Sequence, residues 1–256
     1  MRTFIFCLVI SLISQRSVAQ EKGSVLNGKI EYERRVNKYA FIEKSLNKFN
    51  SNSMREDYIK YKTSHPQFLT MKSVLSFAEN KSLFTPLTAQ DNQVENRWNG
   101  QPIAEQINVV FSDFTEKKTV TEKKVLGDIF LVNDSLKKIT WKITDETRDI
   151  AGFLCRRANG LVLDSVYAVA FYTTSIPLSG GPESFSGLPG MILGIALPHE
   201  NVSWFATRVE VGKPMVPVSK PVKGRQITYR ELVPLLRTTL KNFEGGGGEI
   251  IKALLL

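Results

Sequence analysis

Residues 166–193 read VYAVAFYTTSIPLSGGPESFSGLPGMIL, and this stretch decides the fold. Residues 166–173 alternate between two faces that are both apolar, and a strand of this kind is covered on both sides of a sheet. Small side chains on one face leave room for a packed helix or for a ligand, and we prefer the packed helix. The candidate cavity residues on that face are Ala168, Ala170 and Tyr172.

Residues 180–190 are rich in glycine and proline, and we expect a shaped loop there. Glycine allows positive φ or close backbone approach, and proline fixes φ and lacks an amide donor. The loop is either a structural crossover that closes the sheet or a preformed ligand loop, and the structural interpretation is favoured. Gly190→Val should then destabilise the fold. The candidate loop residues are Gly181, Pro182, Phe185, Gly187, Leu188, Pro189 and Gly190.

The rest of the chain reads mainly as strands. Alternating apolar residues indicate strands near residues 29–36, 69–77 and 107–111. Residues 139–158 predict a hairpin that turns at residues 145–147, and Asn159-Gly160 predicts a further tight turn. The lysine-rich residues 117–124 are interpreted as a solvated hairpin edge rather than as a binding patch.

Helical signals lie near both ends of the chain. Residues 38–49 carry apolar side chains at helical spacing, and Thr228 with Glu231 forms a capping box for a helix over residues 229–241. The glycines at 245–248 indicate a flexible joint, and the apolar residues 250–256 should dock on the sheet or contact a membrane. The fold class is therefore strand-rich α+β, with a mainly antiparallel curved sheet and a few helices.

The first residues carry an export signal. Arg2 precedes an apolar run, and Ser17-Val18-Ala19 places small residues where a signal peptidase cleaves. We expect a signal peptide over residues 1–19 and one globular domain over residues 20–256 that does not span a membrane. Cleavage removes Cys7, so Cys155 is left as a lone thiol, which its apolar neighbours predict to be buried.

Three segments of the chain match, in order, the motifs of one known family. Gly187-Leu188-Pro189-Gly190-Met191-Ile192-Leu193 resembles the signature of the GLPGLI family of exported Bacteroidota proteins, with methionine in place of a leucine. Residues 139–158 resemble its tryptophan-containing hairpin, and residues 170–177 resemble its aromatic-Thr-x-x-Ile-Pro segment. The resemblance implies export to the periplasm or the outer membrane. The order of elements is also similar to the half-barrel of periplasmic lipoprotein carriers.

A search for catalytic patterns favours a non-catalytic protein. His199-Glu200 lacks the second histidine of a zinc-protease helix, so no metal or cofactor is expected. The first hypothesis is an envelope protein that binds an apolar or peptidic ligand, a lipid or an outer-membrane protein in the concavity of the sheet. The alternative is a periplasmic hydrolase that uses Ser184 or Ser186 with His199. The net charge is +9, but export separates the chain from nucleic acid, and no such partner is expected.

Overall fold

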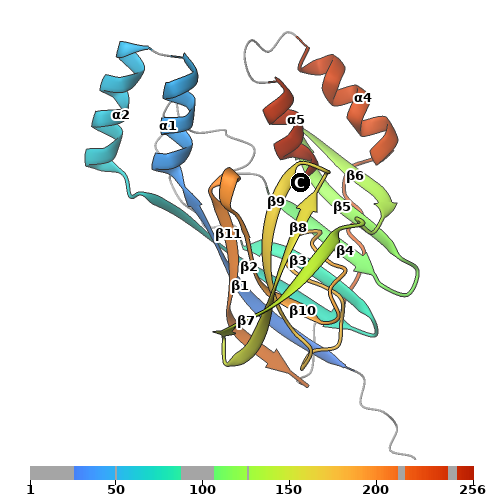
Figure 1. Ribbon diagram of the computed structural model, residues 1–256. Coiled ribbons are helices and arrows are strands. Elements are labelled where there is room, and N and C mark those ends of the chain that lie inside the picture. The colour runs from blue at the N-terminus through green and yellow to red at the C-terminus, as the bar shows by residue number, and fades with distance from the viewer. Residues whose placement is uncertain (1–25, 50, 88–106, 126, 213–216, 242–246) are drawn as a thin grey trace, which may run out of the picture.

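The computed structural model describes residues 26–49, 51–87, 107–125, 127–212, 217–241 and 247–256. The expected signal peptide over residues 1–19 and the expected start at Gln20 lie outside the described residues. The C-terminal end of the chain lies at the same end of the sheet as its helices (Figure 1).

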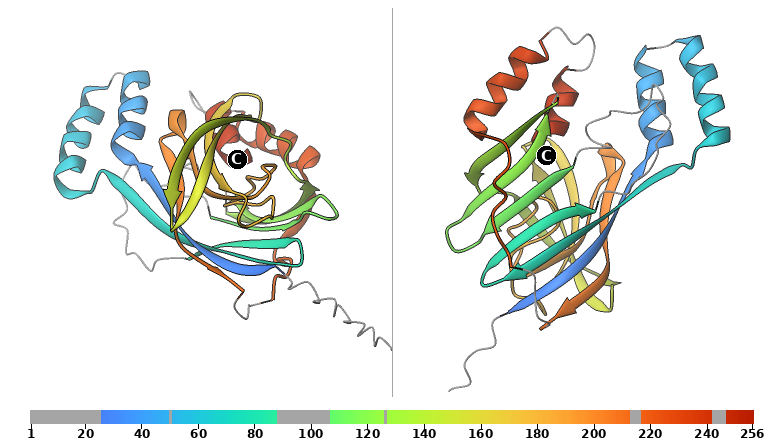
Figure 2. Two further views of the ribbon diagram at one scale, coloured as in Figure 1. Left: turned by 60° about the horizontal axis from the view of Figure 1, so that its bottom comes forward. Right: turned by 180° about the vertical axis from the view of Figure 1, so that it is seen from behind.

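One 12-stranded sheet forms the body of the described chain, in the order β12-β6-β5-β4-β3-β2-β1-β11-β10-β9-β8-β7. Neighbours pair antiparallel except β12, which runs parallel to β6. The sheet curls around its inner face (Figure 2), so the predicted class, with a curved and mainly antiparallel sheet, is confirmed. The strands are β1 (Asn27–Asn37), β2 (Phe68–Ala78), β3 (Lys81–Leu87), β4 (Asn108–Asp113), β5 (Lys118–Val125), β6 (Asp128–Ser135), β7 (Thr140–Ile150), β8 (Phe153–Val162), β9 (Val166–Thr173), β10 (Met191–Leu197), β11 (Val202–Val211) and β12 (Arg225–Thr228).

Two helix pairs stand at one end of the sheet (Figure 1). The pair α1 (Lys38–Phe49) and α2 (Asn52–Ser64) follows β1, and the pair α4 (Tyr229–Thr239) and α5 (Gly247–Leu255) ends the chain. A 3₁₀ turn, η1 (Pro198–Glu200), joins β10 to β11. Helix α4 begins where the sequence predicts, because Thr228 accepts from the Glu231 amide and the Glu231 carboxylate accepts from the Thr228 amide.

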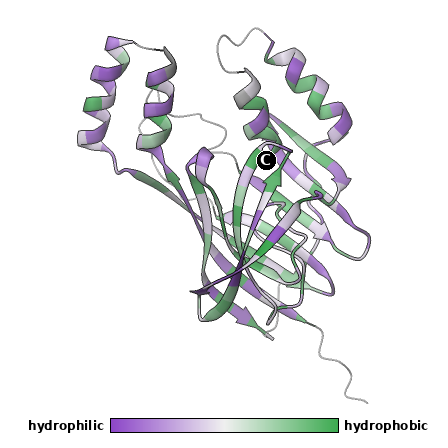
Figure 3. Ribbon diagram, in the orientation of Figure 1, coloured by the Kyte–Doolittle hydropathy of each residue, from purple (hydrophilic) through white to green (hydrophobic). Residues whose placement is uncertain are grey.

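The expected joint at residues 245–248 is wrong for its second half, because Gly247 and Gly248 open α5. The first turn of a helix needs no internal partners for its amides, so glycine is tolerated there. The apolar side chains of α5 pack with α4, β5 and β6, and this packing stabilises the helix. Residues 250–256 therefore dock on the sheet as predicted, and α4 and α5 each carry an apolar face (Figure 3). Gly245 and Gly246 lie outside the described residues.

Two of the expected turns are also wrong. Residues 145–147 lie inside β7, where the register with β8 shifts, and the chain turns at Ala151 and Gly152, which have positive φ. Asn159 and Gly160 lie inside β8. Gly160 is required there by packing, because a Cβ would lie 2.7 Å from Cε3 of Trp141.

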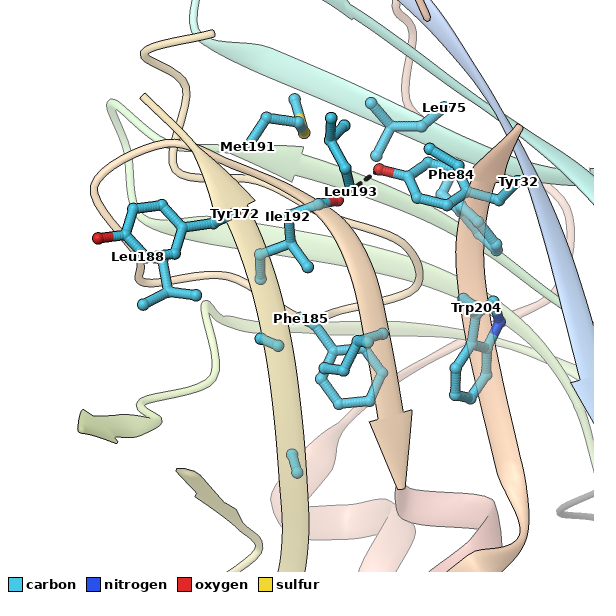
Figure 4. Close-up of a cluster of buried hydrophobic side chains, with 14 of the residues drawn as sticks. Tyr32, Leu75, Phe84, Tyr172, Phe185, Leu188, Met191, Ile192, Leu193 and Trp204 are labelled. Atoms are coloured by element: carbon cyan, nitrogen blue, oxygen red, sulfur yellow. Dashed lines mark hydrogen bonds between the residues drawn. The ribbon is translucent and has the colours of Figure 1, made fainter. Parts of the chain in front are cut away.

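The main core lies where β9, β10, β11, β1 and β2 meet the loop before β10. The Tyr32 hydroxyl on β1 donates a 2.6 Å hydrogen bond to the Ile192 carbonyl on β10, inside this core (Figure 4). Burial raises the pKa of Tyr32 well above its ordinary value, so the hydroxyl stays a donor. Cys155 is fully buried, as predicted, and burial raises the pKa of its thiol to about 11.

Candidate binding site at the end of the curved sheet

The glycine-rich loop over residues 180–190 is packed into the core. Phe185 and Leu188 are only 3% and 2% exposed, and Phe185 lies against Trp204 with ring centroids 5.8 Å apart (Figure 4). Gly181 and Pro182 are also buried, whereas Gly187 and Pro189 reach the surface. The loop thus combines core anchors with a short exposed tip.

At two positions of this loop, neighbouring atoms lie too close for any residue other than glycine. A Cβ on Gly190 would overlap the carbonyl oxygen of Thr173, and a Cβ on Gly181 would lie 2.8 Å from the Ile192 Cβ. Gly187 has a φ of +96°, a conformation that favours glycine. The loop therefore needs glycine for its own packing, whatever else it does.

The three candidate cavity residues of β9 lie in the main core. Ala168 and Ala170 are fully buried and Tyr172 is 2% exposed. Ala253 of α5 belongs to the same cluster of buried side chains. These positions support the packing of the sheet.

A cavity of about 40 Å³ lies near the end of the sheet, between its inner face, the loop and the two C-terminal helices. A space of this size holds about three water molecules. The last three residues form part of its wall, and Figure 2 shows the C-terminal end over the curl of the sheet. The lining residues are Asn108, Val110, Thr119, Thr121, Lys123, Val132, Asp134, Ser135, Lys137, Glu183, Ser184, Tyr229, Leu232, Leu254, Leu255 and Leu256.

Two lysines in this wall bind the end of α5. Lys123 Nζ donates to the carbonyl oxygen of Leu254 at 2.5 Å, and Lys137 Nζ donates to the main-chain oxygens of Leu255 and Leu256 at 2.8 and 2.7 Å. Cationic donors at a helix C-terminus satisfy its last carbonyls and oppose the negative end of its dipole. Together they fasten α5 to β5 and to the segment after β6.

The prediction of a solvated lysine edge at residues 117–124 is therefore wrong for Lys123, which is 6% exposed. Strand β5 pairs with both β4 and β6, so it is an interior strand. Burial, followed by repulsion from Lys137, lowers the pKa of Lys123 to about 7. Burial also lowers the pKa of Lys137 to about 8.

Glu183 is the buried carboxylate of the loop, at 8% exposure and with a φ of +52°. It accepts a 3.1 Å hydrogen bond from Asn108 Nδ2 on β4. Burial raises the pKa of Glu183, and the charges of Arg34 and the two lysines act in the opposite direction. The loop thus places the Glu183 carboxylate near the side chains of Arg34, Lys123 and Lys137.

The two serines of the hydrolase hypothesis and the two histidines of the chain have other contacts. Ser184 Oγ donates to the Leu256 main-chain oxygen at 3.3 Å, and the Ser186 carbonyl accepts from Trp141. The His199 ring lies 6.2 Å from that of Tyr167, and His65 stacks on Tyr61. Within the described ranges, His, Cys, Asp and Glu side chains form no group of three or more that could hold a metal ion.

Sequence reasoning overlooked Lys123, Lys137 and Glu183. The strand pattern held a signal for Lys123, because Thr121, Lys123 and Val125 share one face of β5 and Val125 is a core residue.

No helix among residues described by the structure is long and apolar enough to cross a membrane.

A protein-family model described as "Protein of unknown function (Porph_ging)" matches residues 161–194. The match spans the end of β8, all of β9, the loop and the first half of β10. It therefore includes the Gly187–Gly190 motif and Glu183. No curated protein matches the chain at a significant level.

Among solved structures, the chain is similar to PNGF-II in space group C2, with a TM-score of 0.50 and 14% identity over 80% of this chain and 31% of that one. PNGF-II in space group P21 gives a TM-score of 0.48 and 14% identity over 86% and 33% of the two chains. This chain spans about a third of the length of those proteins. At 14% identity the likeness to the first of these structures shows a shared fold alone.

Proposed function

We propose that this chain is an exported, non-catalytic binding protein that takes an apolar peptide segment where α5 now lies. The observation that carries this proposal is that Lys123 and Lys137 bind three main-chain oxygens, those of Leu254 and Leu255 at the end of α5 and that of Leu256 just after it. Main-chain oxygens are common to all peptides, so the same donors serve any segment that presents them. The lysines recognise a backbone, and the apolar wall beside them selects the side chains.

The apolar wall is formed by strands and helix α4. Val125, Phe130 and Val132 of β5 and β6 pack with Leu232 and Leu236 of α4, and Leu254 of α5 completes this cluster. Each such side chain gains about 1.5–3 kcal/mol from burial. An apolar segment that replaced α5 would gain the same contacts, which is the helix-in-groove mode of peptide recognition.

The small size of the cavity favours a ligand that competes with α5 for its place over a ligand that binds beside α5. About 40 Å³ beside the end of α5 is too small for a lipid tail or a peptide. A ligand therefore has to displace α5. A segment of an outer-membrane protein meets this description, and a lipid is less well matched because it lacks a peptide backbone.

Export and family membership complete the proposal. The apolar run at residues 4–13 and the small residues before Gln20 motivate export. The GLPGLI motif, together with the family match over residues 161–194, motivates membership of the whole chain in that family. Mass analysis of the protein recovered from its native envelope tests export, because retention of residues 1–19 would overturn it, whereas an added lipid mass would overturn only the unmodified start at Gln20.

The binding test uses the full chain and a fluorescent peptide with the sequence of residues 247–256. Leu254→Lys places a third cation beside Lys123 and Lys137 and should release α5, so this variant should bind the peptide about tenfold more tightly than wild type. Leu161→Lys is the matched control, because Leu161 is 53% exposed on β8. Adding Lys137→Met to Leu254→Lys should weaken binding, whereas adding Lys138→Met at the exposed neighbour should not. A folded Leu254→Lys protein that binds no peptide would overturn the proposal.

The hydrolase alternative requires a serine of the loop to reach a histidine. In the structure the Ser184 hydroxyl donates to the Leu256 main-chain oxygen, and the Ser186 main-chain carbonyl accepts from the Trp141 indole. An activity-based fluorophosphonate probe separates the two proposals, because labelling at Ser184 or Ser186 that His199→Ala abolishes would favour the hydrolase.

A further inference from the structure

A second cavity, of about 20 Å³, lies on the inner face of the sheet where β2, β1 and β11 adjoin. Arg34 on β1 pairs in register with Trp204 on β11, and Ser73 lies diagonally across on β2. Glu183 reaches this cavity from the loop and also lines the first one, so the two adjoin. The lining residues are Arg34, Met71, Lys72, Ser73, Phe84, Pro86, Glu183 and Trp204.

Two neutral donors in this wall lack an acceptor among the described residues. They are the Ser73 hydroxyl and the Trp204 Nε1–H, and each of these residues is only 4% exposed. A buried donor without a partner destabilises the folded state. The indole nitrogen can only donate, so what this cavity requires is an acceptor. In Figure 4 the nitrogen of Trp204 lies on the side of the ring turned away from Phe185.

The charge of the cavity adds a preference for an anion. The Arg34 guanidinium lies over the Trp204 ring, 5.0 Å from its centroid, and Arg34 is 6% exposed. Of the charged residues that line this cavity, Arg34 and Lys72 are cationic and Glu183 is anionic.

We infer that this second cavity is a carboxylate-binding site, in which Ser73 Oγ and Trp204 Nε1 donate to one carboxylate oxygen beside the Arg34 guanidinium. A space of 20 Å³ accepts about one oxygen atom, so the oxygen enters and the rest of the ligand stays outside. Glu183 shares the wall and repels a second negative charge, which favours a singly charged carboxylate over a phosphate dianion. Arginine supplies a charge-assisted hydrogen bond that a neutral amide ligand cannot match.

This site is independent of the peptide site. Its donors lie on the sheet itself, so a carboxylate binds whether or not a peptide displaces α5. A failure of peptide binding would leave this inference standing, and the reverse also holds.

Indole nitrogen resonances provide the test. The full chain is labelled with ¹⁵N at its tryptophans, the Trp204 peak is assigned with Trp204→Phe, and sodium acetate is added against equal sodium chloride. The Trp204 peak should shift and saturate at millimolar acetate, whereas the Trp141 peak should stay because its Nε1 already binds the Ser186 carbonyl. Acetamide, of the same shape without the charge, should produce no saturable shift.

Two serine variants complete the test. Ser73→Ala should weaken acetate binding about fivefold, the effect of one lost hydrogen bond. Ser76→Ala, on the opposite face of β2, should leave it unchanged. A Trp204 peak that does not shift with acetate means that the cavity takes water only, and a peak that shifts equally with acetamide means that the charge of the ligand plays no part. Either result overturns the inference. Equal affinity in Ser73→Ala and wild type would overturn it as well.

Discussion

The indole Nε1 of Trp141 donates a 2.9 Å hydrogen bond to the carbonyl oxygen of Ser186. This contact ties the β7–β8 hairpin to the loop that precedes β10, across 45 residues of sequence. The indole also covers Gly160 on β8, which has no side chain to obstruct it. The hairpin tryptophan and the Gly187–Gly190 motif are thus parts of one packing unit.

Trp141→Phe should lower the free energy of unfolding by about 1 kcal/mol, because it removes the donor and leaves the Ser186 carbonyl without it. Urea unfolding followed by circular dichroism measures the change. Ser186→Ala is the control, since the bond uses the main-chain carbonyl and should survive. An equal loss in both variants would show that the side chain of Ser186, rather than this bond, matters.

Gly190→Val should destabilise the fold by about 1–3 kcal/mol or more, because a Cβ at this position would overlap the Thr173 carbonyl oxygen. Thermal unfolding tests it. Gly248→Ala is the matched control, since a Cβ there meets nothing within 4 Å, and it should be neutral or stabilising. A Gly190→Val protein with an unchanged melting temperature that has lost peptide binding would instead identify the loop as part of the ligand site.

Stability should rise with pH between about 7 and 9. The pKa of Lys123 is lowered to about 7 and that of Lys137 to about 8 in the folded chain, below their ordinary value of 10.5. In this window the unfolded chain binds more protons, so raising the pH favours the folded state by up to about 1.4 kcal/mol per pH unit for each lysine. Above about pH 9 the raised pKa of Cys155 acts in the opposite direction.

Lys123→Met measures how much of the rise in stability with pH comes from Lys123 alone. Its stability should rise less with pH than that of wild type, and near pH 7 it should equal or exceed wild type because a desolvated charge is gone. Lys124→Met, at the exposed neighbouring position, should keep the wild-type slope. Parallel curves for Lys123→Met and wild type would contradict the buried position of the ammonium.

The Cys155 thiol should resist modification in the folded chain, because it is fully buried and its pKa is raised to about 11. Ellman's reagent, applied to the chain with Cys7→Ser, should react only as fast as the protein opens. Addition of denaturant should release full reactivity. Rapid labelling under native conditions would show that this part of the core is open.

The sheet and its core were predictable because period-two alternation is a local signal. Residues 29–36 show it clearly, and residues 166–173 read as a strand that is apolar on both faces. The two became the interior strands β1 and β9. The turns at residues 145–147 and at Asn159-Gly160 were misassigned because turn-type residues also occur at a strand irregularity and beneath a large aromatic ring. Only the partner strand distinguishes these cases.

The site was largely outside the reach of sequence reasoning. Lys123 and Leu254 are separated by 131 residues and Asn108 and Glu183 by 75, and no local pattern pairs them. A lysine in a charged strand is usually solvated, so its burial depends on what the end of the chain covers. The loop itself was found, because its glycines and prolines are concentrated in one stretch.

Hydrogen exchange along α5 tests the central claim most directly, because a peptide that binds at the proposed place has to displace this helix. The wild-type full chain is exchanged with and without an excess of the peptide of residues 247–256, and deuterium uptake is compared by mass spectrometry. The account predicts that peptide addition speeds exchange of the α5 amides while β5 and β6 stay protected. Peptide binding that leaves α5 exchange unchanged would contradict it.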